Sequence, residues 1–153
     1  MNLTDDYTIN ELTSKFSESL NLTLKNDIYL MEINANERSI SCKLAGYLQK
    51  EFPEWDVDCE YNRDKDQVKL RSNNSDGFIP DIIVHIRGKP DNLLVIEVKK
   101  SNGDYNDEEK RLEEATSGHF KYTLGIYVIF NVLEKAKDPP TVKFYSEGKV
   151  IPQ

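Results

Sequence analysis

The chain has 153 residues, of which 38% are hydrophobic and 31% charged, a composition typical of a folded globular protein. Its 27 acidic and 20 basic residues give a net charge of -7, which argues against a protein that coats nucleic acid or anionic membrane through bulk charge. Any nucleic-acid contact must therefore be local. A chain of this length can bury a sizeable core without disulfides or a structural metal. Since no repeat or linker divides the sequence, we expect one domain over residues 1–153.

No apolar run approaches the roughly 20 residues that a membrane helix needs. Residues 1–7 are polar and acidic, where a secretory signal would be basic and then apolar. We therefore expect no membrane contact and a cytoplasmic location. Cys42 and Cys59 fit that compartment, and because neither lies in a Cys/His cluster we interpret both as structural or indifferent thiols.

Two helices are expected at the start of the chain. Apolar residues recur every three or four positions over residues 9–31, which predicts an amphipathic helix or a helix broken near Asn26. A second helix is predicted over residues 37–50, with Asn36 as its N-cap. The spacing of its apolar residues puts Glu37 at the edge of the buried stripe.

Strands are expected in the middle of the chain. Residues 55–61 alternate apolar and acidic side chains, the pattern of a half-buried strand. A charged, turn-rich stretch over residues 62–77 separates it from two apolar runs, residues 78–86 and 93–99. We expect these runs to pair as a hairpin around residues 87–92.

A helix and two strands complete the expected order. The pattern predicts a helix over residues 106–117, a buried strand over residues 122–130 and a short edge strand over residues 141–145. Strands and helices in this order predict an α/β fold with a mixed β-sheet flanked by helices, rather than a doubly wound repeat.

The hairpin is expected to bring three ionisable groups together. With its turn centred on Pro90, Asp81 lies opposite residues 98–100 and meets Glu97 and Lys99. Burying carboxylates beside apolar strands costs stability unless they are paired or hold a cation. Mg²⁺ prefers oxygen ligands and is commonly held by one or two carboxylates, so Asp81 and Glu97 are candidate magnesium ligands. Lys99 would orient water or stabilise developing charge.

These residues resemble a known family. Pro80-Asp81 and then Glu97-Val98-Lys99, with Glu37 on an upstream helix, are similar to the motif of the PD-(D/E)XK nuclease superfamily. The resemblance implies a restriction-endonuclease-like fold. It also implies that Asp81 and Glu97 are metal ligands and that Lys99 is the catalytic lysine. Glu37 would be the additional helix acid in the metal site.

The resemblance covers residues 34–131, where the expected elements follow the family's core order α-β-β-β-α-β. Residues 1–33 are an extra N-terminal helical segment that matches nothing diagnostic. Residues 132–153 hold the expected edge strand and a tail.

Each candidate also has a structural interpretation. Asp81 could be a turn aspartate after a proline, and Glu97 and Lys99 a surface ion pair of little energetic value. The helix macrodipole alone favours an acid at Glu37. Glu60 is a reserve ligand, although its strand parity groups it with the polar face.

Other polar residues are weaker candidates. His85 shares the strand face of Asp81, but a single strand histidine is more often a hydrogen-bonded core residue, and His119 follows a helix end. A local basic surface for phosphate could be formed by one of two groups, each of which could equally be solvated: Arg63, Lys65, Lys69 and Arg71, or Lys110, Arg111, Lys121 and Tyr122.

We therefore expect a magnesium-dependent nuclease, with manganese able to substitute, that hydrolyses phosphodiester bonds in DNA. By resemblance, a homodimer or a partner subunit would supply specificity. The alternative is a catalytically silent nucleic-acid-binding or protein-interaction module that keeps the fold. A third interpretation is a structural α/β protein in which the motif is coincidental.

Overall fold

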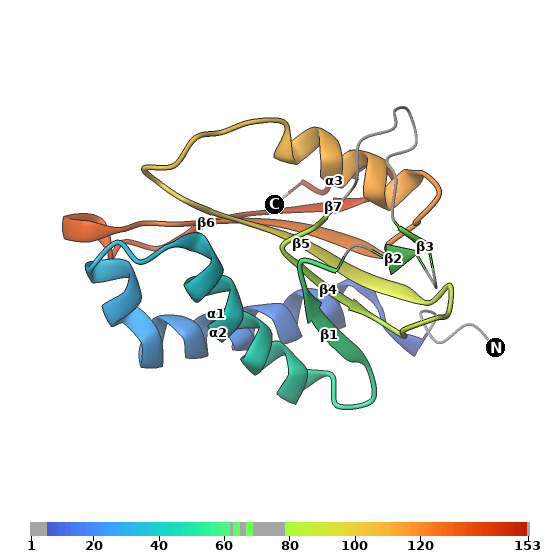
Figure 1. The fold of residues 1–153 in the computed structure, drawn as a ribbon, viewed down its shortest axis with the longest axis horizontal. Helices are drawn as coiled ribbons and strands as arrows, with labels where there is room; N and C mark the ends of the chain where they lie inside the picture. The colour runs from blue at the N-terminus through green and yellow to red at the C-terminus, as the bar shows by residue number, and fades with distance from the viewer. Residues whose placement is uncertain (1–5, 62, 65–66, 69–78, 153) are drawn as a thin grey trace.

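The expected α/β architecture is present in the structure, a computed structural model that describes residues 6–61, 63–64, 67–68 and 79–152 (Figure 1). In this part of the chain three α-helices flank a six-stranded mixed sheet. None of the helices among these residues is long and apolar enough to cross a bilayer.

Helix α1 (Ile9–Glu32) begins at a capping box, in which the Thr8 hydroxyl accepts from the Glu11 amide and the Glu11 carboxylate accepts from the Thr8 amide. The backbone leaves the helical region at Asp27. The predicted break near Asn26 is therefore confirmed.

Helix α2 (Glu37–Glu51) begins at the predicted N-cap, where the Asn36 side chain accepts from the Ser39 amide. Its buried face carries Ile40, Leu44 and Leu48, the apolar stripe expected from their spacing. This face packs onto the sheet and leaves Glu37 half-buried at the start of the helix.

The main sheet has the strand order β1-β4-β5-β6-β7-β8. Its strands are β1 (Asp56–Cys59), β4 (Ile82–His85), β5 (Asn92–Lys100), β6 (Leu124–Phe130), β7 (Thr141–Ser146) and β8 (Lys149–Val150). Only the β5–β6 pair is parallel, and helix α3 (Glu108–Ser117) connects those two strands. Two short strands, β2 (Arg63–Asp64) and β3 (Gln67–Val68), pair with each other, and a 3-10 turn, η2 (Leu133–Lys135), precedes β7.

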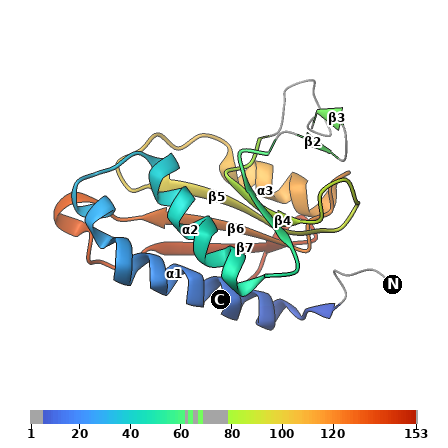
Figure 2. The ribbon, with the colours of Figure 1, turned by 60° about the horizontal axis from the view of Figure 1, so that its bottom comes forward.

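The sheet lies between two helical layers. Helices α1 and α2 cover one face and α3 covers the other (Figure 2). Alternation along β5 divides its side chains between the layers, so Ile96 and Val98 pack with α1 and α2, whereas Val95 packs with α3. Glu97 and Lys99 share the parity of Val95 and lie on the α3 side.

The hairpin register differs from the one expected. Ile82 pairs with Ile96 and Val84 with Leu94, so the hairpin is centred on Lys89, one residue before Pro90. Gly88 has a φ of 72°, a left-handed conformation that favours glycine, and it lets the chain turn about one residue earlier than expected. A bulge at Val84/His85 adds to the shift. Asp81 consequently lies beside Glu97.

Two strand predictions were wrong in detail. The strand expected over residues 55–61 ends at Cys59, because Glu60 has a φ of 50°. In an unbroken strand Tyr61 would lie on the same face as Trp55, but it packs on the α3 side of the sheet instead. The strand expected at the sheet edge, β7, is internal, because the turn at Glu147 and Gly148 adds β8 beyond it.

The N-terminal segment is part of the core, since Leu12 and Phe16 of α1 are fully buried in the cluster that includes the sheet. We predict that Phe16→Ala lowers the free energy of unfolding by about 3–5 kcal/mol, because it leaves a cavity beneath Phe144. Urea denaturation measures this value. Glu18→Ala, on the exposed side of the same helix, should change it by less than about 0.5 kcal/mol. Equal effects would contradict the burial of α1.

Candidate active site

Asp81 and Glu97 lie side by side at the start of β4 and the far half of β5. The Val98 amide donates to Asp81 Oδ2 at 2.7 Å, and the carboxyl group of Glu97 lies close enough for the charge of Asp81 to act on it. Glu97 is only 4% exposed. Burial and the charge of Asp81 raise the pKa of Glu97 well above its usual range, and burial also raises the pKa of Asp81.

Lys99 points to the same side of β5 as Glu97. Its Nζ lies 3.1 Å from Glu108 Oε1 and 4.0 Å from Glu37 Oε1. Burial lowers the pKa of Lys99, but its contact with Glu108 and the negative charges of Glu108 and Glu37 outweigh burial and raise it. Lys99 is therefore a fixed cation at neutral pH.

Glu37 reaches the end of β5 from the first turn of α2. Its Oε2 accepts from the Lys100 amide at 3.0 Å, and the side chain is 33% exposed. A Cβ on Gly103 would lie 3.1 Å from the same oxygen, so the turn after β5 closes tightly around this carboxylate. The structure thus pairs Glu37 with the Lys99–Lys100 segment and not directly with Glu97.

Two further residues at the site were not recognised in these roles from sequence. Glu108 was not considered, and Arg111 was considered only as part of a basic surface. Glu108 is 1% exposed and its Oε2 accepts from the Asn106 amide at 2.9 Å. The only sequence signal was the three-residue spacing of Glu108 and Arg111, which puts them on one side of α3.

Three buried side-chain atoms at this site lie in ion pairs but form no well-directed hydrogen bond: Glu97 Oε1 and Arg111 Nε, which are 3.6 Å apart, and Glu108 Oε1, which is 3.1 Å from Lys99 Nζ. No other such atom occurs among the side chains that the structure describes. Buried polar groups are nearly always satisfied, so unsatisfied atoms concentrated at one place point to a bound ion, water or ligand. This is the strongest structural signal for a functional site.

The donor set fits a hard divalent cation. Carboxylate oxygens are the ligands that Mg²⁺ prefers, and one or two are enough because waters and substrate oxygens complete its shell. Five carboxyl groups (Asp81, Glu97, Glu37, Glu108 and Asp107) lie around two cations (Lys99 and Arg111), so a divalent cation would offset part of the remaining negative charge. Within the described ranges, no group of three His, Cys, Asp or Glu side chains is placed to hold a metal ion, so Glu37 does not join Asp81 and Glu97 as a third ligand.

Solvent reaches Asp81 through a cleft of about 510 Å³ between α2 and the end of β1. Glu37 and Glu60 line this cleft, and Glu60 forms an ion pair with Arg38 at its rim. Glu60 was expected on the polar face of the strand. Its left-handed backbone conformation instead directs its side chain toward Arg38 of α2, so that expectation was wrong. Cys42 and Cys59, both free and exposed, also line the cleft.

The other candidates lie away from the carboxyl pair. His85 is a buried residue whose Nε2 lies 2.7 Å from Asp58, so the interpretation as a hydrogen-bonded core histidine is confirmed. Lys110 is exposed on α3. Lys65, Lys69 and Arg71 lie outside the described residues, and of Arg63 only the backbone is described.

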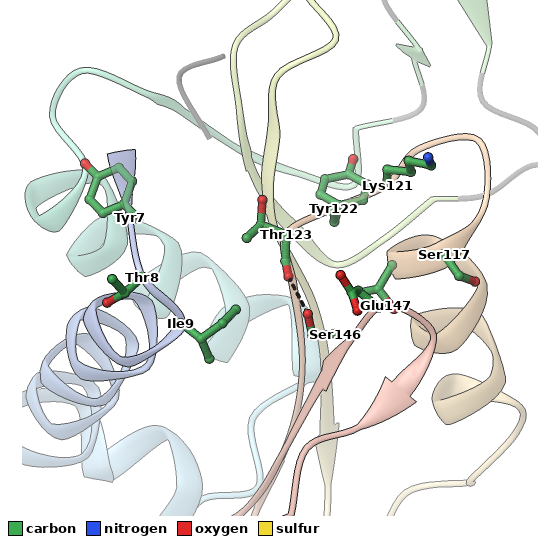
Figure 3. Close-up of a pocket in the computed structure, with 10 residues that line it drawn as sticks. Tyr7, Thr8, Ile9, Ser117, Lys121, Tyr122, Thr123, Ser146 and Glu147 are labelled. Atoms are coloured by element: carbon green, nitrogen blue, oxygen red, sulfur yellow. Dashed lines mark hydrogen bonds between the residues drawn. The ribbon is translucent and has the colours of Figure 1, made fainter. Parts of the chain in front are cut away.

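Lys121 and Tyr122 line a different cavity, of about 740 Å³, between the start of α1 and the end of α3 (Figure 3). It lies before β6, whereas Glu97 pairs with Tyr127 about 13 Å further along the sheet. The Ser146 hydroxyl donates to the Thr123 carbonyl within this cavity. Lys121 and Tyr122 therefore do not belong to the carboxylate site.

Comparisons with known proteins add no assignment, since the chain matched no protein-family model, no curated protein and no solved structure.

The raised pKa of Glu97 predicts a pH-dependent stability in EDTA. Below about pH 4.5 Glu97 is protonated in both states; above it the unfolded chain releases the proton while the folded chain keeps it. Wild type therefore loses stability as pH rises, by about 1.4 kcal/mol for each unit of raised pKa. Glu97→Gln, which avoids this loss, should melt at a higher temperature than wild type at pH 7 and at the same temperature near pH 4.

Glu109→Gln is the matched control. Hydrogen bonds from Tyr145 and Lys143 lower the pKa of exposed Glu109, so this change should bring no stabilisation at pH 7. A lower melting temperature for Glu97→Gln than for wild type at pH 7 would mean that Glu97 is ionised and held by Arg111.

Proposed function

We propose that the protein is a metal-dependent nuclease that hydrolyses phosphodiester bonds in DNA. The observation that carries the proposal is the pair formed by buried Glu97 and half-buried Asp81, on the same side of the sheet as Lys99, with Glu97 Oε1 left without a hydrogen bond. Such a pair is costly to bury unless it performs a task that needs it.

The topology supports the family resemblance. Helix α2, the antiparallel strands β1, β4 and β5, helix α3 and the parallel strand β6 follow the order that a restriction-endonuclease-like core requires, with β2 and β3 inserted after β1. The proposed residues lie where the hairpin β4–β5 meets the starts of α2 and α3.

In the proposed mechanism Asp81 and Glu97 would hold Mg²⁺ or Mn²⁺, and Glu97 would have to be ionised to do so. The chemistry that this cation supplies when bound is a lowered pKa of water and neutralisation of phosphate charge. Lys99, held by Glu108 and Glu37, presents a positive charge beside the two carboxylates and orients the attacking water. Glu37 keeps the end of β5 against α2.

The net charge of -7 supports contact with nucleic acid over a small surface only. A homodimer or a partner subunit would then extend this surface, in the cytoplasm.

A non-catalytic module is the competing function. It is favoured by the ion pairs of Lys99 and Arg111, which already offset part of the carboxylate charge. A binding module would not need a metal, so metal dependence separates the two functions.

Cleavage assays test the proposal. Wild type is incubated with linear, nicked, single-stranded and branched DNA and with RNA, in Mg²⁺, Mn²⁺ or EDTA. We expect cleavage with either metal, none in EDTA, and a loss of about 100-fold or more for Asp81→Asn and for Lys99→Ala.

Asp91→Asn and Lys89→Ala are the controls, because they make the same changes at the turn end of the same hairpin. Both should retain wild-type cleavage. No cleavage by wild type on any substrate, together with no rise in melting temperature on adding metal, would contradict the nuclease. Binding of DNA without metal would then favour the module.

A further inference from the structure

Arg111 reaches the carboxylate site from the first turns of α3. Its Nε lies 3.6 Å from Glu97 Oε1, its Nη2 lies 3.7 Å from Glu108 Oε1, and its Nη1 lies 3.3 Å from Asp107 Oδ1. The side chain is 27% exposed, so one part of the guanidinium is buried and another reaches solvent.

The contacts to Glu97 and Glu108 are too long for hydrogen bonds. In a bidentate ion pair, an arginine donates two parallel N–H···O hydrogen bonds of about 2.7–2.9 Å to a carboxylate. Here Nη1 donates to Asp107, whereas the buried Nε has no hydrogen-bond partner and neither does Glu97 Oε1, the oxygen that it faces. Arg111 therefore keeps donors for an acceptor other than these carboxylates.

Lys99 and Arg111 approach the same carboxylate oxygen. Glu108 Oε1 lies 3.1 Å from Lys99 Nζ and 3.7 Å from Arg111 Nη2, while Oε2 is fixed by the Asn106 amide. Buried Glu108 thus holds two cations beside one another. Arg111 offers a planar guanidinium group with several N–H donors, and Lys99 offers an ammonium group. Together the two cations match the oxygens of a phosphate group.

We propose that Arg111 binds the phosphate of the substrate, beside Lys99 and next to the carboxylate pair. This assignment rests on the proposed function for the identity of the substrate, a phosphodiester, and on the unused donors of Arg111 for the contact.

The proposal separates anion binding from cation binding. Loss of the Arg111 charge removes an attraction for phosphate and also removes a repulsion for a metal ion near Glu97. Phosphodiester binding should therefore weaken, while Mn²⁺ binding is retained or strengthened. A residue that only supports the fold would not divide the two affinities in this way.

Three proteins are compared: wild type, Arg111→Gln and Lys25→Gln, which changes an exposed lysine of α1 on the opposite side of the sheet. Affinity for a short fluorescein-labelled DNA duplex is measured by anisotropy in Ca²⁺, and affinity for Mn²⁺ by calorimetry without DNA. We expect Arg111→Gln to bind DNA about tenfold more weakly or worse, with Mn²⁺ affinity kept, and Lys25→Gln to stay within about twofold of wild type.

If Arg111→Gln does not fold, Arg111→Lys tests the phosphate contact. This variant keeps a positive charge beside Glu97 and Glu108 but lacks the planar guanidinium group. It should bind DNA more weakly than wild type. Wild-type DNA affinity in the folded variant would overturn the inference, as would a loss of Mn²⁺ affinity equal to the loss of DNA affinity.

The two hypotheses fail separately. If wild type cleaves DNA and the Arg111 variants bind DNA with wild-type affinity, the proposed nuclease activity is supported and the proposed phosphate contact of Arg111 is wrong. If wild type shows no cleavage, and Arg111→Gln nevertheless loses DNA affinity, the proposed nuclease activity is wrong and Arg111 remains a phosphate-binding residue.

Discussion

The hydrogen bond from the Val98 amide to Asp81 holds together the arrangement on which the site depends. It joins the start of β4 to the far half of β5 and sets the Asp81 carboxyl beside that of Glu97. Both lie among apolar strands, where two ionised carboxylates would repel each other with little screening. Protonation of Glu97 relieves that repulsion, so burial and the charge of Asp81 raise its pKa, and a divalent cation would relieve the repulsion in another way.

The charges around this pair come from both helical layers. Glu37 arrives from α2, and Glu108 and Arg111 from α3. The parallel pairing of β5 and β6 requires a crossover, and α3 is that crossover, so its first turn begins close to the end of β5. The topology of the sheet thus explains why Glu108 and Arg111, distant in sequence from Asp81, meet the hairpin there.

Several parts of this arrangement were predictable because they depend on local periodicity. The apolar spacing of α2 put Glu37 at the edge of its buried stripe, where it is half-buried, and strand parity put Glu97 and Lys99 on one face. The hairpin itself was expected, but its register was not, because Gly88 and a bulge moved the turn. Glu108 was missed since acids in a helix's first turn usually reflect the macrodipole alone.

The sequence by itself determined the order and type of the main elements, the α/β class and the candidate residues Asp81, Glu97, Lys99 and Glu37. Such features follow from side-chain periods of 2 and 3.6, which are properties of short segments. Only the tertiary structure decided that Asp81 neighbours Glu97, that Glu108 is shared by Lys99 and Arg111, and that three polar atoms remain unsatisfied. These depend on turn geometry and on packing between distant segments, where a shift of one residue changes which charges meet.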